Sequence, residues 1–443
     1  MKVRDYFYFP CKNKELFFQQ LLKYSEKYEN VCFINGNEQQ TKTLQIPYGS
    51  FPKIFAIGAK QQLAYLETTP FCELQNFLTS IKDWAFGFFA YDLKNDIEKL
   101  SSENFDGLFF PKLFFFQPEL IFIEENEFVK VGFFSENYNK LQIEDICLKV
   151  NDIDLNFAEI TFQQLSFQNR FTKEEYLVTV EKIKHHIQIG DIYEMNFCME
   201  FFAENAVLDS LTAYILLNKI SPTSFSAFYK MGDKFIISAS PERYLKKNDN
   251  ILVSQPIKGT ARRGQNETED CFIKEELQNN IKERAENVMI VDLVRNDFSR
   301  VAQRGSVKVA ELCKIYSFPQ VHQLISTVVC NIKQSVDIVE TIEKTFPMGS
   351  MTGAPKVMAM KLIEKYERTK RGVFSGAVGF FTPEGNFDFN VVIRSMLYNK
   401  TTKYLSFSVG SAITSKSNAE DEYEECLLKA SAIIKTLNIN KLQ

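Results

Sequence analysis

The sequence predicts a protein of mixed α and β structure built around a large apolar core. Its 443 residues, 45% of them hydrophobic, are enough for one large domain or two to three ordinary ones. Short apolar runs of strand character recur along the whole length. From Thr172 onward they alternate with segments in which apolar residues recur at helical spacing.

The first 160 residues or so predict mainly strands. The Phe-rich bursts lie at 53–59, 85–91 and 120–125, with turn signals at Asn35-Gly36 and Asp106-Gly107 between strands. We expect the segment 151–167, which is rich in polar and small residues, to cross between two halves of the molecule. No catalytic pattern stands out in this region.

The central part of the chain predicts a well-capped helix followed by alternating elements. Thr172 and Glu175 form a capping box, and Gly190 ends the helix. The elements expected after it are a strand at 193–204, a helix at 210–220, and strands at 226–230 and 234–245.

Residues 254–264, SQPIKGTARRG, follow a short apolar strand at 251–253. Pro256 fixes φ and Gly259 permits close backbone approach, with Lys258 between them. We expect Lys258 at the end of a strand, where poor access to water lowers its pKa and makes the amine a nucleophile. This stretch alone favours the alternative, a lysine that extends into solvent, and the rest of the chain reverses that balance.

A long helix is expected over 267–300. Glu283 and Glu286 lie three residues apart and share one side of it. Its apolar stripe is expected to contain Leu277, Ile281, Ala285, Val288 and Met289.

The last helix is expected to begin at Ser417, with Glu420 completing a capping box. Glu422, Glu425 and Lys429 lie together on the border of its apolar stripe. Carboxylates beside a core are costly unless a cation meets them. The remaining expected elements are strands at 307–312, 326–332, 377–382, 389–397 and 405–414, and a helix that opens at Pro355.

Composition excludes several classes of function. The net charge of −4 gives no basic field for nucleic acid or an anionic membrane. Nine cysteines without a C-x-x-C spacing suit a reducing compartment, and three histidines leave little room for a zinc site. Neither a signal peptide nor a membrane span is recognisable. We expect a cytoplasmic protein.

Ten segments resemble, in order, the chorismate-utilising enzyme family, which includes anthranilate synthase and aminodeoxychorismate synthase large components and the isochorismate and salicylate synthases. They are GDIYEMN (190–196), SPER (240–243), PIKGTARRG (256–264), RAENVMIVDLVRND (284–297), RGSVKV (304–309), VHQLIST (321–327), FPMGSMTGAPK (346–356), SGAVGF (375–380), IRS (393–395) and DEYEECLLKA (421–430). The N-terminal third resembles the family only weakly, around 87–93.

The resemblance implies an α+β fold like that of anthranilate synthase component I. In that fold two intertwined subdomains stack their mostly antiparallel sheets, helices flank the sheets, and the active site lies in the cleft between the halves. It also implies an N-terminal region at 1–160 and a chorismate-binding catalytic region at 161–443, which together form one unit.

The resemblance is closest to aminodeoxychorismate synthase component I, where the PIKGT segment supplies a lysine nucleophile. Anthranilate synthases usually have a small residue at the position of Lys258. Isochorismate-type enzymes carry a water-activating lysine in the segment that here contains Glu194. The implied activity is that of a transaminase-type transferase, which converts chorismate and ammonia to 4-amino-4-deoxychorismate for para-aminobenzoate and folate synthesis.

The resemblance also implies the roles of individual residues. Lys258 would attack C2 of chorismate, Glu242 would protonate the departing C4 hydroxyl, and His322 would lie near that hydroxyl. The implied Mg²⁺ ligands are Glu286 and Glu425, with Glu283 and Glu422 as additional or water-mediated partners. The implied substrate contacts are Thr352, Arg394, Gly410, Lys429 and Glu194.

Each of the less certain roles has a structural alternative. Arg394 and Lys429 would otherwise form ion pairs, Thr352 would only shape a turn, and His322 would be a packed core residue. Three departures from the family pattern affect substrate placement. Phe374 stands where many relatives have Tyr, Gly410-Ser411-Ala412 replaces a G-x-G turn, and Glu194 replaces a common Gln. Glu194 would either accept a proton from incoming ammonia or pair with a neighbouring cation.

No G-x-C-x-G elbow of a glutamine amidotransferase is recognisable in the chain. Ammonia is therefore expected from solution or, preferably, from a separate glutaminase subunit, and pyruvate release would belong to another protein. Two alternatives stay open. One is anthranilate synthase component I, and the other is a non-catalytic scaffold that binds chorismate or a glutaminase. The intact set of acidic residues and Lys258 argues against the scaffold.

Overall fold

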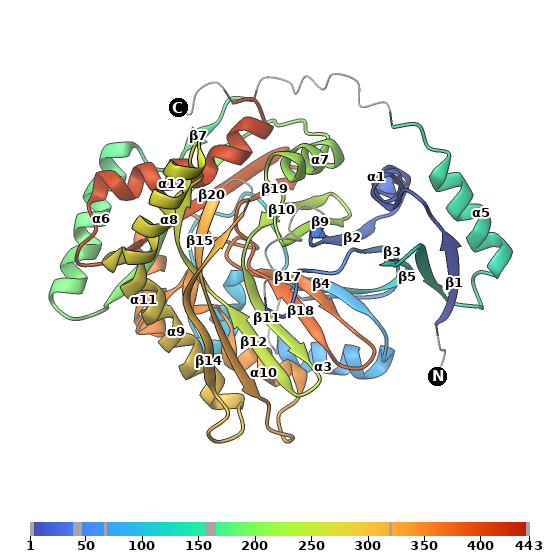
Figure 1. Cartoon of the computed structure of the whole chain (residues 1–443), viewed down its shortest axis with the longest axis horizontal. Helices are drawn as coiled ribbons and strands as arrows, with labels where there is room; N and C mark the ends of the chain where they lie inside the picture. Colours follow the sequence, from blue (N-terminus) through green and yellow to red (C-terminus); the bar gives the residue numbers. More distant parts are fainter. Residues whose placement is uncertain (1–3, 39–46, 66–68, 156–164, 319–320, 440–443) are drawn as a thin grey trace.

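The computed structural model describes residues 4–38, 47–65, 69–155, 165–318 and 321–439. Its 20 described strands belong to one hydrogen-bonded network, and every strand pair in it is antiparallel. Helices lie outside the strands (Figure 1). The expected α+β class is therefore confirmed.

The network consists of two rows of strands that share β5 (Leu113–Glu125). The first row runs through β1 (Asp5–Pro10), β6 (Phe128–Phe133), β5, β3 (Ile54–Tyr65), β2 (Asn30–Asn35), β9 (Phe225–Met231), β10 (Lys234–Ser240), β19 (Ser395–Asn399), β20 (Tyr404–Ile413) and β8 (Glu194–Ala203). The short strands β7 (Gln168–Asn169) and β16 (Gly353–Ala354) pair with β8.

The second row leaves β5 through β4 (Ala85–Phe89). It continues through β17 (Ala377–Phe381), β18 (Phe387–Asn390), β11 (Arg243–Asn248), β12 (Ile251–Gln255) and β15 (Val321–Asn331), with β13 (Ile257–Arg262) and β14 (Lys308–Ser317) beside β15. Pairing of β2 with β9 and of β4 with β17 joins the first third of the chain to the rest.

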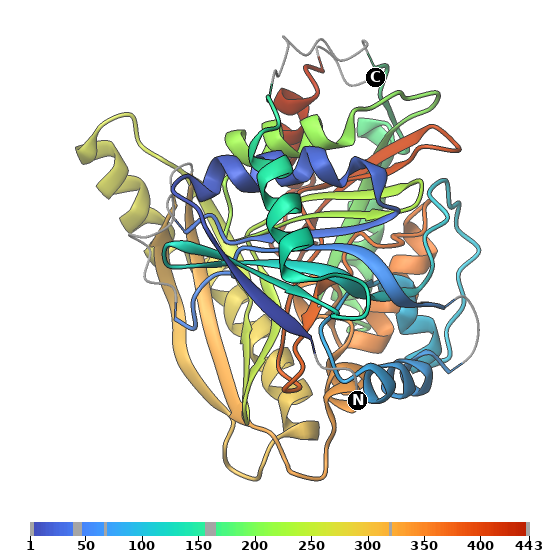
Figure 2. The same ribbon diagram turned by 90° about the vertical axis from the view of Figure 1, so that its right-hand side faces the viewer.

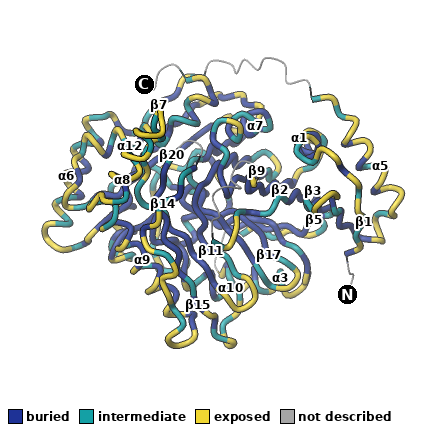
Figure 3. Tube along the Cα trace, in the orientation of Figure 1, coloured by how far each residue is buried: buried dark blue, intermediate teal, exposed yellow. Residues whose placement is uncertain are grey.

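Two apolar cores hold the rows of strands and the helices together. One joins residues from both rows with α9 (Ile281–Val301) and α10 (Ile338–Thr345). The other lies between the first row and α1 (Lys14–Tyr24), α5 (Lys140–Asn151), α6 (Lys173–Gln188), α7 (Ser210–Ile220) and α12 (Ala419–Thr436). In β9, Ala227 and Tyr229 enter the first core and Phe228 the second, because successive strand side chains point to opposite faces. Figure 2 shows α1 and α5 lying across the first row. Figure 3 shows buried strands at the centre of the molecule, with β1 at its edge.

The first third of the chain contains helices that the sequence analysis missed. They are α1, α3 (Pro70–Ile81), the short α4 (Lys94–Glu98) and α5. The Phe-rich composition suggested strands, but Asn139 and Gln142 form a capping box at the start of α5, a signal that was available in the sequence. The expected crossing at 151–167 lies partly outside the described residues.

The single helix expected over 267–300 is wrong. The chain forms α8 (Glu267–Asn279) and α9, separated at Asn280, whose side chain accepts from the backbone of Glu283 and caps α9. The break shifts the phase, so most of the expected stripe is wrong as well: Ile281 is 77% exposed. Glu286 and Asn287 are buried on α9 instead.

Other helices agree with the sequence. The capping box of Thr172 and Glu175 opens α6, and α7 spans the expected 210–220. Pro355 is the N-cap of α11 (Lys356–Tyr366) rather than its first residue. Asn418, not Ser417, caps α12. No helix in the described ranges combines the length and apolar character that a membrane crossing needs.

The strand predictions hold except at three interruptions. The stretch 234–245 breaks at Pro241-Glu242 between β10 and β11, and the stretch 389–397 breaks before Arg394 between β18 and β19. Lys258 does not end a strand, because β13 resumes directly after Pro256. The first two interruptions contain Glu242 and Arg394, to which the sequence analysis assigned chemistry, and Lys258 lies just after the third.

Candidate active site

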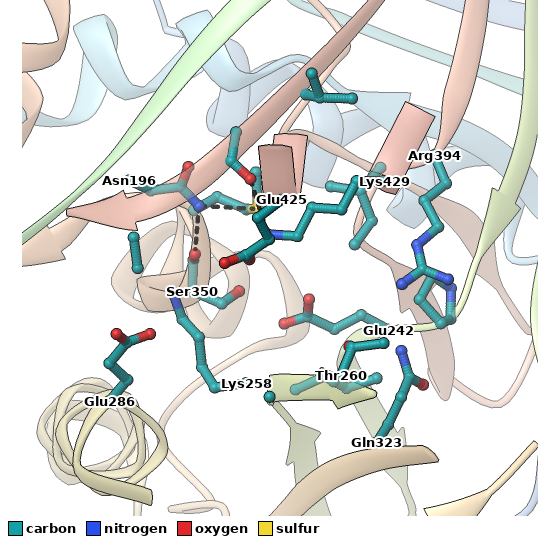
Figure 4. Close-up of a pocket in the computed structure, with 18 of the residues that line it drawn as sticks. Asn196, Glu242, Lys258, Thr260, Glu286, Gln323, Ser350, Arg394, Glu425 and Lys429 are labelled. Atoms are coloured by element: carbon teal, nitrogen blue, oxygen red, sulfur yellow. Dashed lines mark hydrogen bonds and ion pairs between the residues drawn. The ribbon is translucent and has the colours of Figure 1, made fainter. Parts of the chain in front are cut away.

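A cavity opens where both rows of strands meet α9, α12 and the 3₁₀ turn η4 (Gly349–Met351). The space there that protein atoms do not fill, with the open solvent at its mouth included, is about 800 Å³. Its polar and charged lining side chains are Asn196, Glu242, Lys258, Thr260, Glu283, Glu286, Gln323, Ser350, Arg394, Ser408, Glu425 and Lys429 (Figure 4).

Lys258 reaches the cavity through a bulge in β13. The register of β13 against β15 shifts between Ile257 and Thr260, and Gly259 has φ +89°. A Cβ at Gly259 would come within 3.2 Å of the Glu283 side chain. Bulges with glycine in the left-handed region redirect neighbouring side chains, and here the Lys258 side chain is 11% exposed.

The charge state of Lys258 differs from the expectation. Burial alone would lower the pKa of this ammonium, but the carboxylates of Glu194, Glu286 and Glu242 outweigh it and raise the pKa above its usual value. Nζ donates to Glu194 Oε1 at 3.0 Å. The expected lowered pKa is therefore wrong for the unliganded site, because the surrounding carboxylates come from three other elements that the local sequence does not reveal.

Glu242 projects from the interruption between β10 and β11 into the middle of the cavity (Figure 4). It is 4% exposed. Burial raises the pKa of its carboxyl to about 7, although the positive charges of Lys258 and Arg394 oppose the rise. Glu242 can therefore hold a proton at neutral pH, which a general acid requires.

Arg394 supplies positive charge at the other end of the cavity from Glu286 (Figure 4). Its backbone has φ +51°, a left-handed conformation that is uncommon outside glycine. Within the described part of the chain its guanidinium has neither a hydrogen bond nor an ion pair. Burial lowers the pKa of this guanidinium. A half-buried arginine without a partner suits a carboxylate ligand.

Lys429 is engaged within the protein. Nζ contacts Glu425 Oε1 at 2.6 Å and donates to the carbonyl oxygen of Gly410 at 2.9 Å. Burial alone would raise the pKa of Glu425, but Lys429, Lys282 and Lys258 hold it below its usual value. In this structure Lys429 forms the ion pair that was the alternative to substrate binding.

Carboxylates crowd the end of the cavity near α9. Burial raises the pKa of Glu286 to about 8, and Glu194 and Glu283 add to that rise against the opposing charge of Lys258. Burial and Glu425 also raise the pKa of Glu283. Oε1 of Glu286 is buried without a hydrogen bond among the described residues and lies 3.9 Å from Lys282 Nζ.

These carboxylates fit a hard divalent cation by their chemistry. Mg²⁺ prefers a few carboxylate oxygens and leaves other positions to substrate or water, and Glu286, Glu283 and Glu425 line one cavity with an unpaired buried oxygen among them. The described residues contain no group of three or more His, Cys, Asp or Glu side chains gathered around a single metal position. Further ligands would have to come from the substrate or from water.

Glu422 does not line the cavity in the structure. It is buried behind it, where Oε1 accepts from Lys282 Nζ at 2.7 Å and links α12 to α9. Its other carboxylate oxygen has no hydrogen bond within the described ranges. In this position Glu422 is better placed to hold Lys282 than to bind a metal directly.

His322 does not face the cavity, which corrects the expectation. Nδ1 lies 2.8 Å from Ser317 Oγ and Nε2 lies 3.0 Å from Asp270 Oδ1, so the imidazole ties β15 to β14 and α8. The next residue, Gln323, lines the cavity because side chains alternate along a strand. Its Oε1 is buried without a hydrogen bond in the described structure.

Thr352 also points away from the cavity, and its structural alternative is the observed one. Its hydroxyl donates to the carbonyl oxygens of Met348 and Gly349 and closes the turn. Ser350, two residues earlier, lines the cavity instead. The sequence analysis missed Ser350 and Gln323, and the only available signal was their place inside the family segments.

The segment Gly410-Ser411-Ala412 is part of β20 rather than a turn. Gly410 and Ala412 line the cavity, whereas Ser411 turns to the other face and contacts Tyr176 Oη at 3.2 Å. A Cβ at Gly410 would lie 2.4 Å from Cys198 Sγ, so this glycine lets β20 pack against β8. Phe374 lines the cavity with an apolar ring.

A buried ion pair supports the cavity wall from behind. Arg371 contacts both oxygens of Glu367 and donates to the backbone carbonyls of Met351 and Asn196. Asn196 in turn donates to the Ser350 carbonyl at 2.9 Å. The network ties β8, through Asn196, to η4.

Comparisons with known proteins identify the family of this chain. The model of the family described as "chorismate binding enzyme" matches residues 29–435. Anthranilate synthase component 1 of Aquifex aeolicus is 31% identical over 370 residues, which are 80% of this chain and 74% of that protein. Aminodeoxychorismate synthase component 1 of Bacillus subtilis is 31% identical over 367 residues, 81% of this chain and 77% of that protein.

The chain spans a smaller share of some other curated relatives. It matches 62% of anthranilate synthase component 1 of Bacillus subtilis and 31% of the chloroplastic aminodeoxychorismate synthase of Arabidopsis thaliana. Among solved structures, anthranilate synthase component I from Streptococcus pneumoniae has a TM-score of 0.75 at 25% identity and covers 87% of this chain and 92% of its own. The residues matched by the family model include every residue that lines the cavity. The chain belongs to the chorismate-binding enzyme family.

Proposed function

We propose that the chain is an aminodeoxychorismate synthase component I, which converts chorismate and ammonia to 4-amino-4-deoxychorismate. The observation that carries this proposal is Lys258, whose amine enters the cavity next to the proton-holding Glu242. A lysine amine can form a covalent adduct and split one displacement into two easier steps. Anthranilate synthases of the family usually have a small residue at this position.

The cavity residues divide the work between binding and proton transfer. Arg394 binds a substrate carboxylate bidentately, and Gln323 and Ser350 offer hydrogen bonds to the ring substituents. Mg²⁺, when held by Glu286, Glu283 and Glu425, supplies positive charge for the ring carboxylate. This part of the cavity would otherwise repel an anionic substrate.

The covalent step proceeds as an allylic displacement. The lone pair of the Lys258 amine forms a bond to C2, the C1–C2 double bond shifts to C1–C6, and the C5–C6 double bond shifts to C4–C5. The C4–O bond breaks with a proton from Glu242, which releases water. Ammonia then attacks C4, the two double bonds return to C5–C6 and C1–C2, and the C2–N bond breaks with its electron pair on Lys258. The proton lost from the new ammonium group restores Glu242.

The ammonia source in this proposal is a separate glutamine amidotransferase subunit, because relatives with this architecture carry the name "component 1". Location in the cytoplasm and a role in folate synthesis belong to the same proposal.

The test incubates the purified chain with chorismate, Mg²⁺ and ammonium, with and without an added aminodeoxychorismate lyase, and identifies products by mass. We expect aminodeoxychorismate alone, and para-aminobenzoate only when lyase is added. Lys258→Ala should reduce this activity at least about 10³-fold, whereas Lys308→Ala, at an exposed position on β14, should not change it. An unchanged product at an unchanged rate in Lys258→Ala would refute the nucleophile.

Anthranilate synthase component I is the second candidate, because the relative from Aquifex aeolicus with that name covers as much of the chain as the aminodeoxychorismate synthase does. The same incubation separates the two, since anthranilate is fluorescent and forms with pyruvate without any lyase. Binding of chorismate without any product would favour the scaffold.

A further inference from the structure

Glu194 makes an unusual contact at the start of β8. It is 1% exposed, and its Oε1 accepts from Lys258 Nζ at 3.0 Å. Its backbone is fixed by pairing with Ala354 of β16. Gly353, with φ +150°, brings that strand so close that a Cβ there would lie 2.2 Å from the Glu194 carbonyl oxygen. The carboxylate is therefore held rigidly against the amine.

The pair is less completely hydrogen-bonded than a structural ion pair in the same protein. Both oxygens of Glu367 accept hydrogen bonds, from Arg371 and from the backbone N–H of Cys198. Oε2 of Glu194 has no hydrogen bond among the described residues although it is buried. Buried polar atoms are normally satisfied, so the second oxygen of Glu194 is available for a proton or a ligand.

We propose that Glu194 is the proton acceptor that converts the Lys258 ammonium to the free amine before it attacks the substrate. This inference rests on the proposed function, because it requires Lys258 to be the nucleophile. Glu194 would act directly on the reacting nitrogen and thus be a catalytic residue.

Other carboxylates face Lys258 but have different tasks. Glu242, from the connection between β10 and β11, must carry a proton toward the leaving hydroxyl. Glu286 and Glu283 of α9 and Glu425 of α12 are the candidate cation ligands, and Lys429 of α12 adds a positive charge. Among the residues that the structure describes, Glu194 is the carboxylate within hydrogen-bond distance of Nζ, as a general base must be.

The proton balance closes within the site. One proton passes from Nζ to a Glu194 oxygen, which leaves a neutral amine and a neutral carboxylic acid. The amine lone pair forms the C2–N bond while Glu242 protonates the leaving oxygen. When ammonia has displaced Lys258, the freed amine recovers its proton from Glu194, and the ion pair is restored.

The test measures adduct formation in a single turnover without ammonia. The Lys258-containing peptide gains the mass of chorismate minus water, and its rate of appearance is followed from pH 6 to pH 9 at saturating chorismate. In Glu194→Gln the amide keeps the shape but accepts no proton, so we expect the rate at pH 7 to fall about 10²-fold or more. The deficit should shrink as pH rises because hydroxide replaces the missing base. Glu194→Asp should retain part of the rate.

Two results would overturn the inference alone. Equal or faster adduct formation in Glu194→Gln would mean that Glu194 only keeps Lys258 charged, since its removal takes away a charge that favours the ammonium. A deficit of the same size at every pH would mean a structural role. Absence of any adduct in the unaltered protein would instead refute both this inference and the covalent part of the proposed function, which separates the two failures.

Discussion

The two ends of the active-site cavity differ in charge. They also differ in whether their charged side chains already have partners within the protein. At the end near α9, the carboxylates of Glu286, Glu283 and Glu194 surround the Lys258 ammonium. At the other end, Arg394 has no partner in the described chain, and Gln323 has an unsatisfied amide oxygen. Glu242 lies between them (Figure 4).

This contrast explains how one cavity can accept a dianion. The Arg394 end is ready for a carboxylate as it stands. The α9 end repels a carboxylate until a cation neutralises Glu286 and its neighbours, which is a physical reason to expect metal dependence of substrate binding at that end. The following predictions test the contrast, from the largest expected effect to the smallest.

The largest effect is expected at the boundary between the two ends. Glu242→Gln removes the proton donor and should lower kcat by about 10²- to 10⁴-fold. In the unaltered protein the pKa of Glu242 is raised to about 7, and the protonated form is the acid. The activity, divided by the concentration of free ammonia at each pH, should therefore fall as pH rises through about 7. The residual activity of Glu242→Gln should not show this fall. A pH profile that is flat between 6 and 8 would contradict the assignment.

At the arginine end, Arg394→Lys keeps the charge but loses the planar pair of donors. Because a charge-assisted hydrogen bond contributes about 1.5–3 kcal/mol, the Kd for chorismate should rise about 10- to 100-fold. Arg368→Lys is the matched control, since Arg368 forms an exposed ion pair with Glu175 of the kind that contributes little. Equal Kd values for the two variants in a binding titration would show that Arg394 does not hold the substrate.

At the carboxylate end, Glu286→Gln should raise the Mg²⁺ concentration for half-maximal activity about 10- to 100-fold, since it removes a proposed ligand. Glu425→Gln should act in the same direction. Glu422→Gln is the informative comparison, because Glu422 lies behind the cavity on Lys282. We expect a change below about threefold there, and an equally large change in all three variants would move Glu422 into the metal site.

The smallest effects separate two adjacent residues of β15. Gln323→Leu should raise the KM for chorismate about 3- to 10-fold through the loss of one neutral hydrogen bond. His322→Ala should leave KM unchanged and instead destabilise the fold by about 1–3 kcal/mol, measured by denaturant unfolding, because His322 ties β15 to α8 and β14. The opposite pattern would restore His322 to the active site.

The sequence predicted many elements with strong local signals. The capping box at Thr172 and the helical spacing in α6, α7 and α12 identified those helices. The helix α1 was missed because its Phe-rich composition was given more weight than the helical spacing of its apolar residues. In that helix Phe17, Phe18, Leu21 and Leu22 are buried together, and such a cluster resembles a buried strand in composition.

Prediction of the candidate site failed mainly by small shifts along the chain. Gln323 lies where His322 was expected, and Ser350 where Thr352 was expected. Alternation along a strand sends adjacent residues to opposite faces, and a one-residue difference in register exchanges them. Bulges in β13 and β14 set that register against β15, and they depend on pairing between distant segments.

The sequence alone determined the chemical groups of the site and their order, because the motifs that contain Glu242, Lys258, Glu286, Arg394 and Glu425 can be recognised without coordinates. Only the tertiary structure decided which way each group points and what charge it carries. Interruptions between paired strands direct Glu242 and Arg394 into the cavity. Carboxylates from α9, β8 and the β10–β11 connection keep Lys258 protonated, since the balance between burial and opposite charge depends on neighbours that are remote in the chain.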